Sequence, residues 1–339
     1  MTDSARLGGF KILKDVVRIS LLPPEDMLRF PETLCQALAR NRINLPYLTT
    51  VRDGNAWGVV LVVDVSDEES SVRLLREGFG RVSASLSRSA VISVFPHKRN
   101  PEISGKLLEA FAEEDVEPDG LAISPSAVSV IVGEKSIQKA SDALFAPFSF
   151  SAYRTPEDWK MAQKGKEKMF KEVMASYQEK KPGVYGLEYG TGQELIQMRL
   201  EKAQVAPVGS SFKSLDCHGV RLAFLATGPS REKGKETLSF CLPASEGATC
   251  KHALSILSPG VAVETISPVT TFSMNGPHFG DRYGIISQLL TAFFENGVTM
   301  LALACTVASI TGVVPQEDTE LAIETIRKRF DVPSVARRD

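Results

Sequence analysis

The sequence predicts an α+β protein built from about four copies of one βαββαβ unit, arranged as two tandem pairs. Residues 271–314 show the pattern of a strand, a loop, a helix and two further strands. The same order appears in looser form from residue 11 and starts again near residue 90. A segment rich in lysine and glutamate, at 151–183, then separates two halves of the chain. Units with this order of elements fold as ferredoxin-like modules.

The first predicted module spans 11–89, and Pro31 marks the first turn of its first helix. The turn signal Asp53-Gly54-Asn55 predicts a hairpin in its centre. The predicted elements are, in order, a strand at 16–22, a helix from Pro31, strands at 45–51 and 57–65, a helix at 67–78 and a strand at 82–86.

The second predicted module spans 90–150. Asn100 followed by Pro101 is typical of a helix start, because asparagine caps the free amides and proline fits the first turn. The predicted elements are a strand at 90–95, a polar loop at 96–100, a helix with Ile103, Leu107, Leu108 and Phe111 on one face, strands at 121–124 and 127–132, and a helix at 134–144.

A linker helix is predicted at 151–183, where Thr155 and Asp158 form a capping signature and Pro182-Gly183 ends the pattern. The third module, 184–268, is a divergent copy. Its predicted elements are a strand at 184–189, a Gly-Thr-Gly loop at 190–192, a helix at 193–202, a hairpin loop at 228–237, strands at 239–242 and 261–266, and a helix at 248–257.

The fourth predicted module, 269–335, carries the strongest pattern. Its first strand breaks at Asn275-Gly276-Pro277, and a helix with apolar residues at three- and four-residue steps follows Asp281. Asn296-Gly297 predicts the end of that helix, since glycine readily adopts the left-handed conformation found there. Strands at 299–305 and 308–314 and a helix at 318–330 complete the module.

The composition excludes several classes of protein. The 339 residues are 43% hydrophobic and 24% charged with a net charge of −2, so there is no basic excess for nucleic acid. No window approaches the roughly 18 apolar residues of a membrane span, and no signal-peptide pattern is present. The five cysteines are an odd number and fit reduced thiols. We therefore expect a cytoplasmic protein.

The motif MNGPHFGDRYGI, followed by a helix ending in ENGV and then by TVASITGVV, resembles an ACT domain. The stretch ISVFPHKRNPEISGKLLEAF, in the second module, is similar to the tandem ACT region of aspartokinases. The resemblance implies small regulatory βαββαβ modules that bind amino acids where two copies meet. It extends over the regulatory half of that family only, because we find no lysine-glycine-glycine phosphate-binding start and no dinucleotide-binding fingerprint.

The loop of the fourth module suits a free amino acid. The first amides of a helix have no partners within the helix and favour a carboxylate, while Asn275 and Asp281 offer acceptors for the ammonium group. Gly276 and Gly280 let the backbone approach a ligand closely. The resemblance implies that residues at the start of the last strand also contact the ligand. The predicted contacts are Asn275, Gly276, Pro277, His278, Phe279, Gly280, Asp281, Arg282, Tyr283, Gly284, Ile285, Ser309 and Ile310.

Simpler interpretations of these residues stay open. Asp281 is also a good helix cap, Asn275-Gly276-Pro277 could form only a turn, and His278 fits an ordinary surface loop. A possible second site in the second module consists of His97, Lys98, Arg99 and Asn100, which suit a carboxylate or phosphate, or simply a solvated loop. Cys217-His218 and Cys250-Lys251-His252 match no regular zinc spacing, and no base–nucleophile arrangement can be named for them.

The main expectation is therefore a non-catalytic amino-acid sensor that lacks a kinase domain, forms a homodimer or higher homo-oligomer, and passes its signal to an unidentified effector protein. We expect no cofactor, no metal, no nucleic acid and no membrane. Two rivals remain. One is an aspartokinase-related enzyme or enzyme subunit with its active site in 184–268, and the other is a purely structural oligomerisation module.

Overall fold

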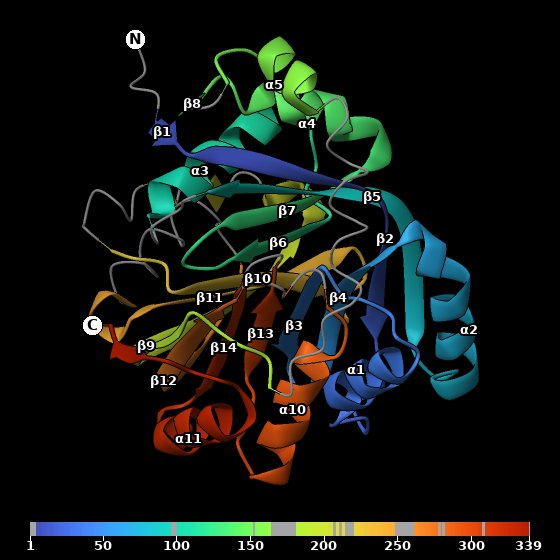
Figure 1. Cartoon of the computed structure of the whole chain (residues 1–339), viewed down its shortest axis with the longest axis vertical. Coiled ribbons are helices and arrows are strands. Elements are labelled where there is room, and N and C mark those ends of the chain that lie inside the picture. The colour runs from blue at the N-terminus through green and yellow to red at the C-terminus, as the bar shows by residue number, and fades with distance from the viewer. Residues whose placement is uncertain are drawn as a thin grey trace.

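One large sheet of 13 strands organises the chain, and its helices lie on the outside (Figure 1). This arrangement makes the protein a mixed α/β fold. The computed structural model describes residues 5–95, 100–151, 153–163, 181–205, 208–209, 212–213, 220–247, 261–276, 279, 282–306 and 309–338.

The first half of the chain contains two successive series of strands and helices that share a long strand. Its elements are β1 (Ala5–Leu7), β2 (Gly9–Leu22), α1 (Phe30–Arg40), β3 (Tyr47–Asp53), β4 (Ala56–Asp64), η1 (Val65–Asp67), α2 (Glu68–Gly78), β5 (Ser83–Phe95), α3 (Pro101–Glu113), β6 (Gly120–Ile123), β7 (Val128–Gly133), η2 (Glu134–Ser136), α4 (Ile137–Ala143), β8 (Phe148–Phe150) and α5 (Pro156–Gln163).

The second half repeats the same plan. Its elements are β9 (Gly186–Glu201), α7 (Lys202–Val205), β10 (Phe224–Pro229), β11 (Lys235–Pro243), η3 (Ala244–Glu246), β12 (Val263–Asn275), α10 (Ile285–Glu295), β13 (Ala302–Cys305), β14 (Ser309–Pro315), η4 (Gln316–Asp318), α11 (Thr319–Arg329) and β15 (Val335–Arg337).

Several local signals in the sequence are confirmed. The Asn100 side chain accepts a hydrogen bond from the Glu102 amide at 2.8 Å and starts α3. At the start of α5, the Asp158 amide donates to the Thr155 hydroxyl at 3.2 Å, as in a capping box. Gly297, which follows α10, has φ +74 and so supplies the left-handed conformation that ends this helix.

The long strands β5 and β12 each take part in two neighbouring series. In β5, residues 83–89 pair with the end of β2, and residues 89–94 pair with β7. In β12, residues 263–266 pair with β9, and residues 269–275 pair with β14. In each half, one long strand is therefore shared by two successive series of strands and helices.

The two halves meet side by side at two places in the sheet. In the first seam, β3 pairs antiparallel with β13, and helices α1 and α10 lie next to each other (Figure 1). In the second seam, β6 pairs antiparallel with β10, and α3 contacts the segment around Gly209. Because β9 pairs with β11 as well as with β12, the sheet closes into a ring.

The core has three parts, which follow from this ring. One apolar cluster lies between the sheet and helices α1, α10 and α11, and another lies between the sheet and helices α3 and α4. A third cluster, which includes Tyr47, Val60, Leu195 and Phe224, comes from the opposite faces of the strands. The strands are therefore covered on both sides, and they contain long runs of buried residues.

This coverage explains the main errors of the sequence analysis. The predicted strand, Gly-Thr-Gly loop and helix at 184–202 are the single strand β9, which has partners on both sides over residues 193–198. Its polar residues Gln193, Glu194 and Gln197 are buried, so the expected alternation of apolar and polar residues is lost.

Two predicted module boundaries fall inside continuous strands. The boundary between 89 and 90 lies within β5, and the boundary between 268 and 269 lies within β12. The sequence analysis also missed β1, β8, β10 and β15. The division into four modules stays a prediction, and much of the predicted linker helix and the predicted helix at 248–257 lie outside the described residues.

None of the helices in the described part of the chain is long and apolar enough to cross a membrane.

Candidate ligand site at the first seam

The structure describes only part of the predicted ligand loop. Asn275, Gly276, Phe279 and 282–285 are described, together with Ser309 and Ile310 on β14. Pro277, His278, Gly280 and Asp281 lie outside the described residues. The predicted acceptor at Asn275 is therefore placed, while the one at Asp281 is not.

Asn275 and Ser309 face each other across the sheet, because they are paired in the register of β12 and β14. The amide oxygen of Asn275 is buried, and no hydrogen-bond partner is recorded for it within the described structure. A buried acceptor without a partner is costly, so a ligand donor would be favourable there. The Ser309 hydroxyl lies 3.0 Å from that of Thr306, and Ile310 packs in the core.

The start of α10 provides donors for an anion. Gly284 has φ +85 and precedes the helix, and its carbonyl accepts the Gln288 amide at 2.9 Å. This left-handed conformation favours glycine. The amides of the next residues, Ile285 to Ser287, belong to the first turn, where no intrahelical acceptor is available. A carboxylate placed there would be stabilised by these amides and by the helix dipole.

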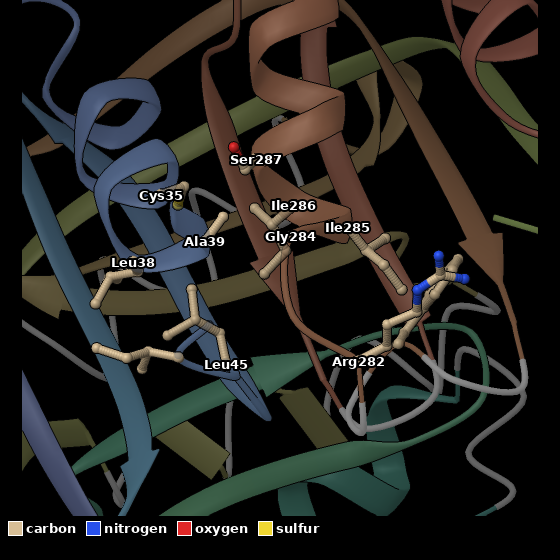
Figure 2. A pocket seen from close by; sticks show the side chains of 11 residues that line it. Cys35, Leu38, Ala39, Leu45, Arg282, Gly284, Ile285, Ile286 and Ser287 are labelled. Atoms are coloured by element: carbon tan, nitrogen blue, oxygen red, sulfur yellow. The ribbon is translucent and has the colours of Figure 1, made fainter. Parts of the chain in front are cut away.

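A small pocket lies beside this helix start (Figure 2). Leu38 and Ala39 of α1 form one side, and Gly284 and Ile285 form the other. Arg282 is the charged residue among those that line it. The pocket encloses about 10 Å³, which is room for about one water molecule, so an amino acid would fit only if α1 and α10 moved apart.

The helices on either side of the pocket are held together by few polar contacts. The Gln36 amide donates to the Thr291 hydroxyl at 3.0 Å. The guanidinium of Arg29 lies 3.4 Å from the centre of the Phe294 ring. Such contacts are individually weak, and α1 and α10 are otherwise joined through the apolar cluster that contains Leu38 and Leu289.

Phe279, which lines the pocket, is almost completely buried. A Cβ added to Gly276 would lie 2.7 Å from the Phe279 ring, so glycine at 276 allows this ring to sit where it does. Tyr283, in contrast, is 37% exposed. The structure therefore brings Phe279, Arg282, Gly284 and Ile285 to one pocket.

Sequence reasoning missed the α1 side of this pocket. Cys35, Leu38, Ala39, Ile43 and Leu45 line it, although they precede the predicted loop by more than 200 residues in the chain. Burial raises the pKa of the Cys35 thiol to about 12, so it stays protonated and is a poor nucleophile.

The possible second site is placed only at Asn100, because His97, Lys98 and Arg99 lie outside the described residues. The Asn100 side chain caps α3 and is therefore already engaged. The cysteine and histidine candidates at 217–218 and 250–252 also lie outside the described residues. The described residues contain no group of three or more metal-ligating side chains.

Comparison with known proteins identifies likeness in fold but none in sequence. No family model and no curated protein sequence matches the chain. The structure resembles an aspartate kinase from Synechocystis with a TM-score of 0.78 and 15% identity, over 96% of this chain and 56% of that one. The regulatory subunit of aspartate kinase from Thermus thermophilus matches over 44% of this chain and 99% of that one, with a TM-score of 0.39 and 16% identity.

Three expectations from the sequence are corrected by the Synechocystis match. The likeness to aspartate kinase covers 96% of this chain, and so most of the divergent segment 184–268 as well. The assignments as a regulatory protein without a kinase, as a non-catalytic sensor and as a protein that is not an enzyme are therefore wrong. What the match shows in their place is an aspartokinase-like fold over nearly the whole chain. The chain spans just over half the length of that kinase.

Proposed function

We propose that this chain is an aspartokinase-related enzyme of amino-acid metabolism, or a subunit of one. A single observation supports the proposal, namely the match to an aspartate kinase over 96% of the chain at a TM-score of 0.78. At 15% identity this likeness establishes the fold and not the activity. That the chain takes part in the phosphorylation of aspartate is what we propose.

The finer part of the proposal concerns regulation. We propose that the βαββαβ series are ACT-like modules and that an amino-acid effector binds at the first seam. Its carboxylate would lie at the start of α10 near Arg282, where unpaired amides and a positive charge favour an anion. The buried amide oxygen of Asn275 would serve as an acceptor for the ligand's ammonium group.

The small size of the pocket suggests how such an effector would act. A ligand that needs more space than about 10 Å³ binds only an arrangement in which α1 and α10 are further apart. It then shifts the protein towards that arrangement by its difference in affinity, which for allosteric proteins is about 1–3 kcal/mol. The closed seam would be the ligand-free arrangement.

The catalytic proposal is tested by measuring ADP release that depends on aspartate. The chain is purified under gentle conditions from the cells that make it and assayed with ATP and aspartate, and the extract is depleted with an antibody against the chain. Activity in the purified chain, or activity lost with the chain on depletion, supports the proposal. Aspartate kinase activity that stays in the depleted extract, with none in the purified material, overturns it.

The regulatory proposal is tested with the same preparation and each of the twenty amino acids. A true effector changes aspartate-dependent turnover and, at about 100 times its dissociation constant, adds about 2.7 kcal/mol to the stability of the native state. Ala39→Leu, which fills the pocket from α1, should abolish both responses. Ala37→Leu, on the same helix but outside the pocket lining, is the matched control and should keep them. Responses that persist in Ala39→Leu would exclude this site.

A further inference from the structure

Residues 83–88 of β5 form an open edge of the sheet. They pair with β2 on one side, and no described strand pairs with their other side. Ser83, Ala84, Ser85 and Leu86 are exposed, and 40% of the Leu86 surface is accessible although this side chain is apolar. An exposed strand edge offers unpaired backbone groups to another strand.

The other open edges of the sheet carry features that discourage pairing. The segment 263–266 of β12 contains Glu264 and is followed by Pro268, and the segment 9–13 of β2 contains Lys11 and precedes a bulge. β15 has only three residues. Charges, proline, bulges and short length are the usual protections of an edge strand.

The β5 edge lacks these protections. Its sequence, Ser-Ala-Ser-Leu-Ser-Arg, contains no lysine and no proline. The one charged side chain, Arg88, forms an ion pair with Glu68 of α2 at 2.6 Å, so its charge is balanced within the chain. A neutral edge of this kind does not repel a second strand of the same sequence.

We infer that β5 and α2 form the surface through which two copies of this chain associate. Strand β5 pairs antiparallel with β5 of the second copy, and α2 packs beside α2 of the second copy. The chain already contains this arrangement twice, because each seam joins edge strands and places helical segments side by side. The β5 edge repeats it between molecules.

The exposed face of α2 is complementary to itself. Glu69 and Arg76 are exposed and seven residues apart, so they lie on one face of the helix, with Val72 between them. In an antiparallel pair related by a two-fold axis, Glu69 of each copy faces Arg76 of the other, and Val72 lies near the axis.

The test is sedimentation velocity and light scattering of the full chain over a wide range of concentration. The wild-type chain should be a dimer that dissociates on dilution. Arg76→Glu places two glutamates opposite each other at two symmetric positions and should weaken the dimer by about tenfold or more. The charge-swapped double variant, Glu69→Arg with Arg76→Glu, restores the pairing and should regain wild-type dissociation.

Two further variants separate the strand from the helix. Leu86→Lys puts a lysine on the open edge and should also weaken the dimer, whereas Thr265→Lys, on the already protected β12 edge, should leave it unchanged. Circular dichroism verifies that each variant is folded. A wild-type chain that stays monomeric, or a dimer that ignores both Leu86→Lys and Arg76→Glu, would overturn the inference. Neither outcome depends on the proposed kinase activity.

Discussion

The two seams join the same kinds of elements but pack their helices differently. In the second seam, a Cβ added to Gly105 of α3 would lie 2.6 Å from the Gly209 carbonyl oxygen, and one added to Gly209 would lie 2.8 Å from the Gly105 carbonyl oxygen. In the first seam, a Cβ added to Gly284 would lie 3.7 Å from the Ala39 methyl group. The second seam is closed by backbone contact, while the first leaves a small pocket.

This difference indicates which seam is suited to a ligand. Backbone atoms in direct contact cannot be displaced by a side-chain rotation, so a ligand at the second seam would have to separate two chain segments. At the first seam, the side chains of Gln36, Arg29 and their partners can move instead. We therefore expect the second seam to be rigid and the first seam to be adaptable.

Gly105→Ala should have the largest effect on stability. The added methyl group would overlap the Gly209 carbonyl oxygen and force the second seam apart, at a cost of about 2–3 kcal/mol in the free energy of unfolding. Gly78→Ala in α2 is the control, since its added methyl group meets no atom within 4 Å and should be neutral or slightly stabilising. Urea unfolding measures both, and equal effects would show that the second seam is not closed by its glycines.

The stability of the fold should also depend on pH. Burial raises the pKa of Glu236, on β11 next to β10, to about 7, and Arg18 on β2, 3.6 Å away, opposes this only in part, as does Lys202, while Asp119 adds to it. A carboxyl group with a raised pKa in the folded state favours folding while it is protonated, so its contribution falls as pH rises from about 4.5 to about 7.

Glu236→Gln should remove this part of the pH dependence. The wild-type free energy of unfolding should fall relative to that of the variant by about 2–3 kcal/mol over this range, at 1.36 kcal/mol for each pKa unit. Thermal or urea unfolding at several pH values measures the difference. Parallel profiles for the two proteins would show that Glu236 is ionised throughout the range.

Ala39→Leu should overpack the first seam at a smaller cost than Gly105→Ala. The pocket has room for about one water molecule, so the three added carbon atoms fill it and press on the residues around Gly284, and the free energy of unfolding should fall by roughly 1–2 kcal/mol. Urea unfolding of the two variants side by side is the measurement. A loss as large as that of Gly105→Ala would mean that the first seam is packed as tightly as the second.

Gln36→Ala should have the smallest effect. It removes the hydrogen bond from Gln36 to Thr291 across the seam and one from Gln36 to Glu32 within α1. Since Glu32 keeps both hydrogen bonds from Arg29, the net loss should be about 0.5–1.5 kcal/mol. If the first seam opens to admit a ligand, the variant should also bind its effector slightly more tightly, because less is lost on opening. Calorimetric titration with the effector measures this, and weaker binding would contradict an opening seam.

The sequence predicted the elements that follow one regular pattern. Helix α10 and strands β13 and β14 were recognised because their apolar residues recur at the helical period or form short runs bounded by turns. Strand β9 was not, because it is covered on both sides and its buried polar residues gave it the pattern of a helix. A sequence pattern identifies a strand when one face is exposed and the other is buried. Most of β9 has no exposed face.

The candidate site was predicted on one side only. The loop before α10 was recognised from its glycines and the helix start, but the opposite wall comes from α1. The hydrogen bond between Gln36 and Thr291 joins residues 255 positions apart in the chain. Nothing local to either segment marks the other as its neighbour, and only the pairing of β3 with β13 brings them together.

The closed ring of strands has a mechanical consequence. In an open sheet, one edge can swing freely while the rest stays still. In a closed ring, the angle between β3 and β13 cannot change unless the angle between some other pair of neighbouring strands changes as well. The second seam, between β6 and β10, is held rigid by its glycine contacts. A change at the first seam would therefore strain the long strands β5 and β12, which lie between the two seams in the ring.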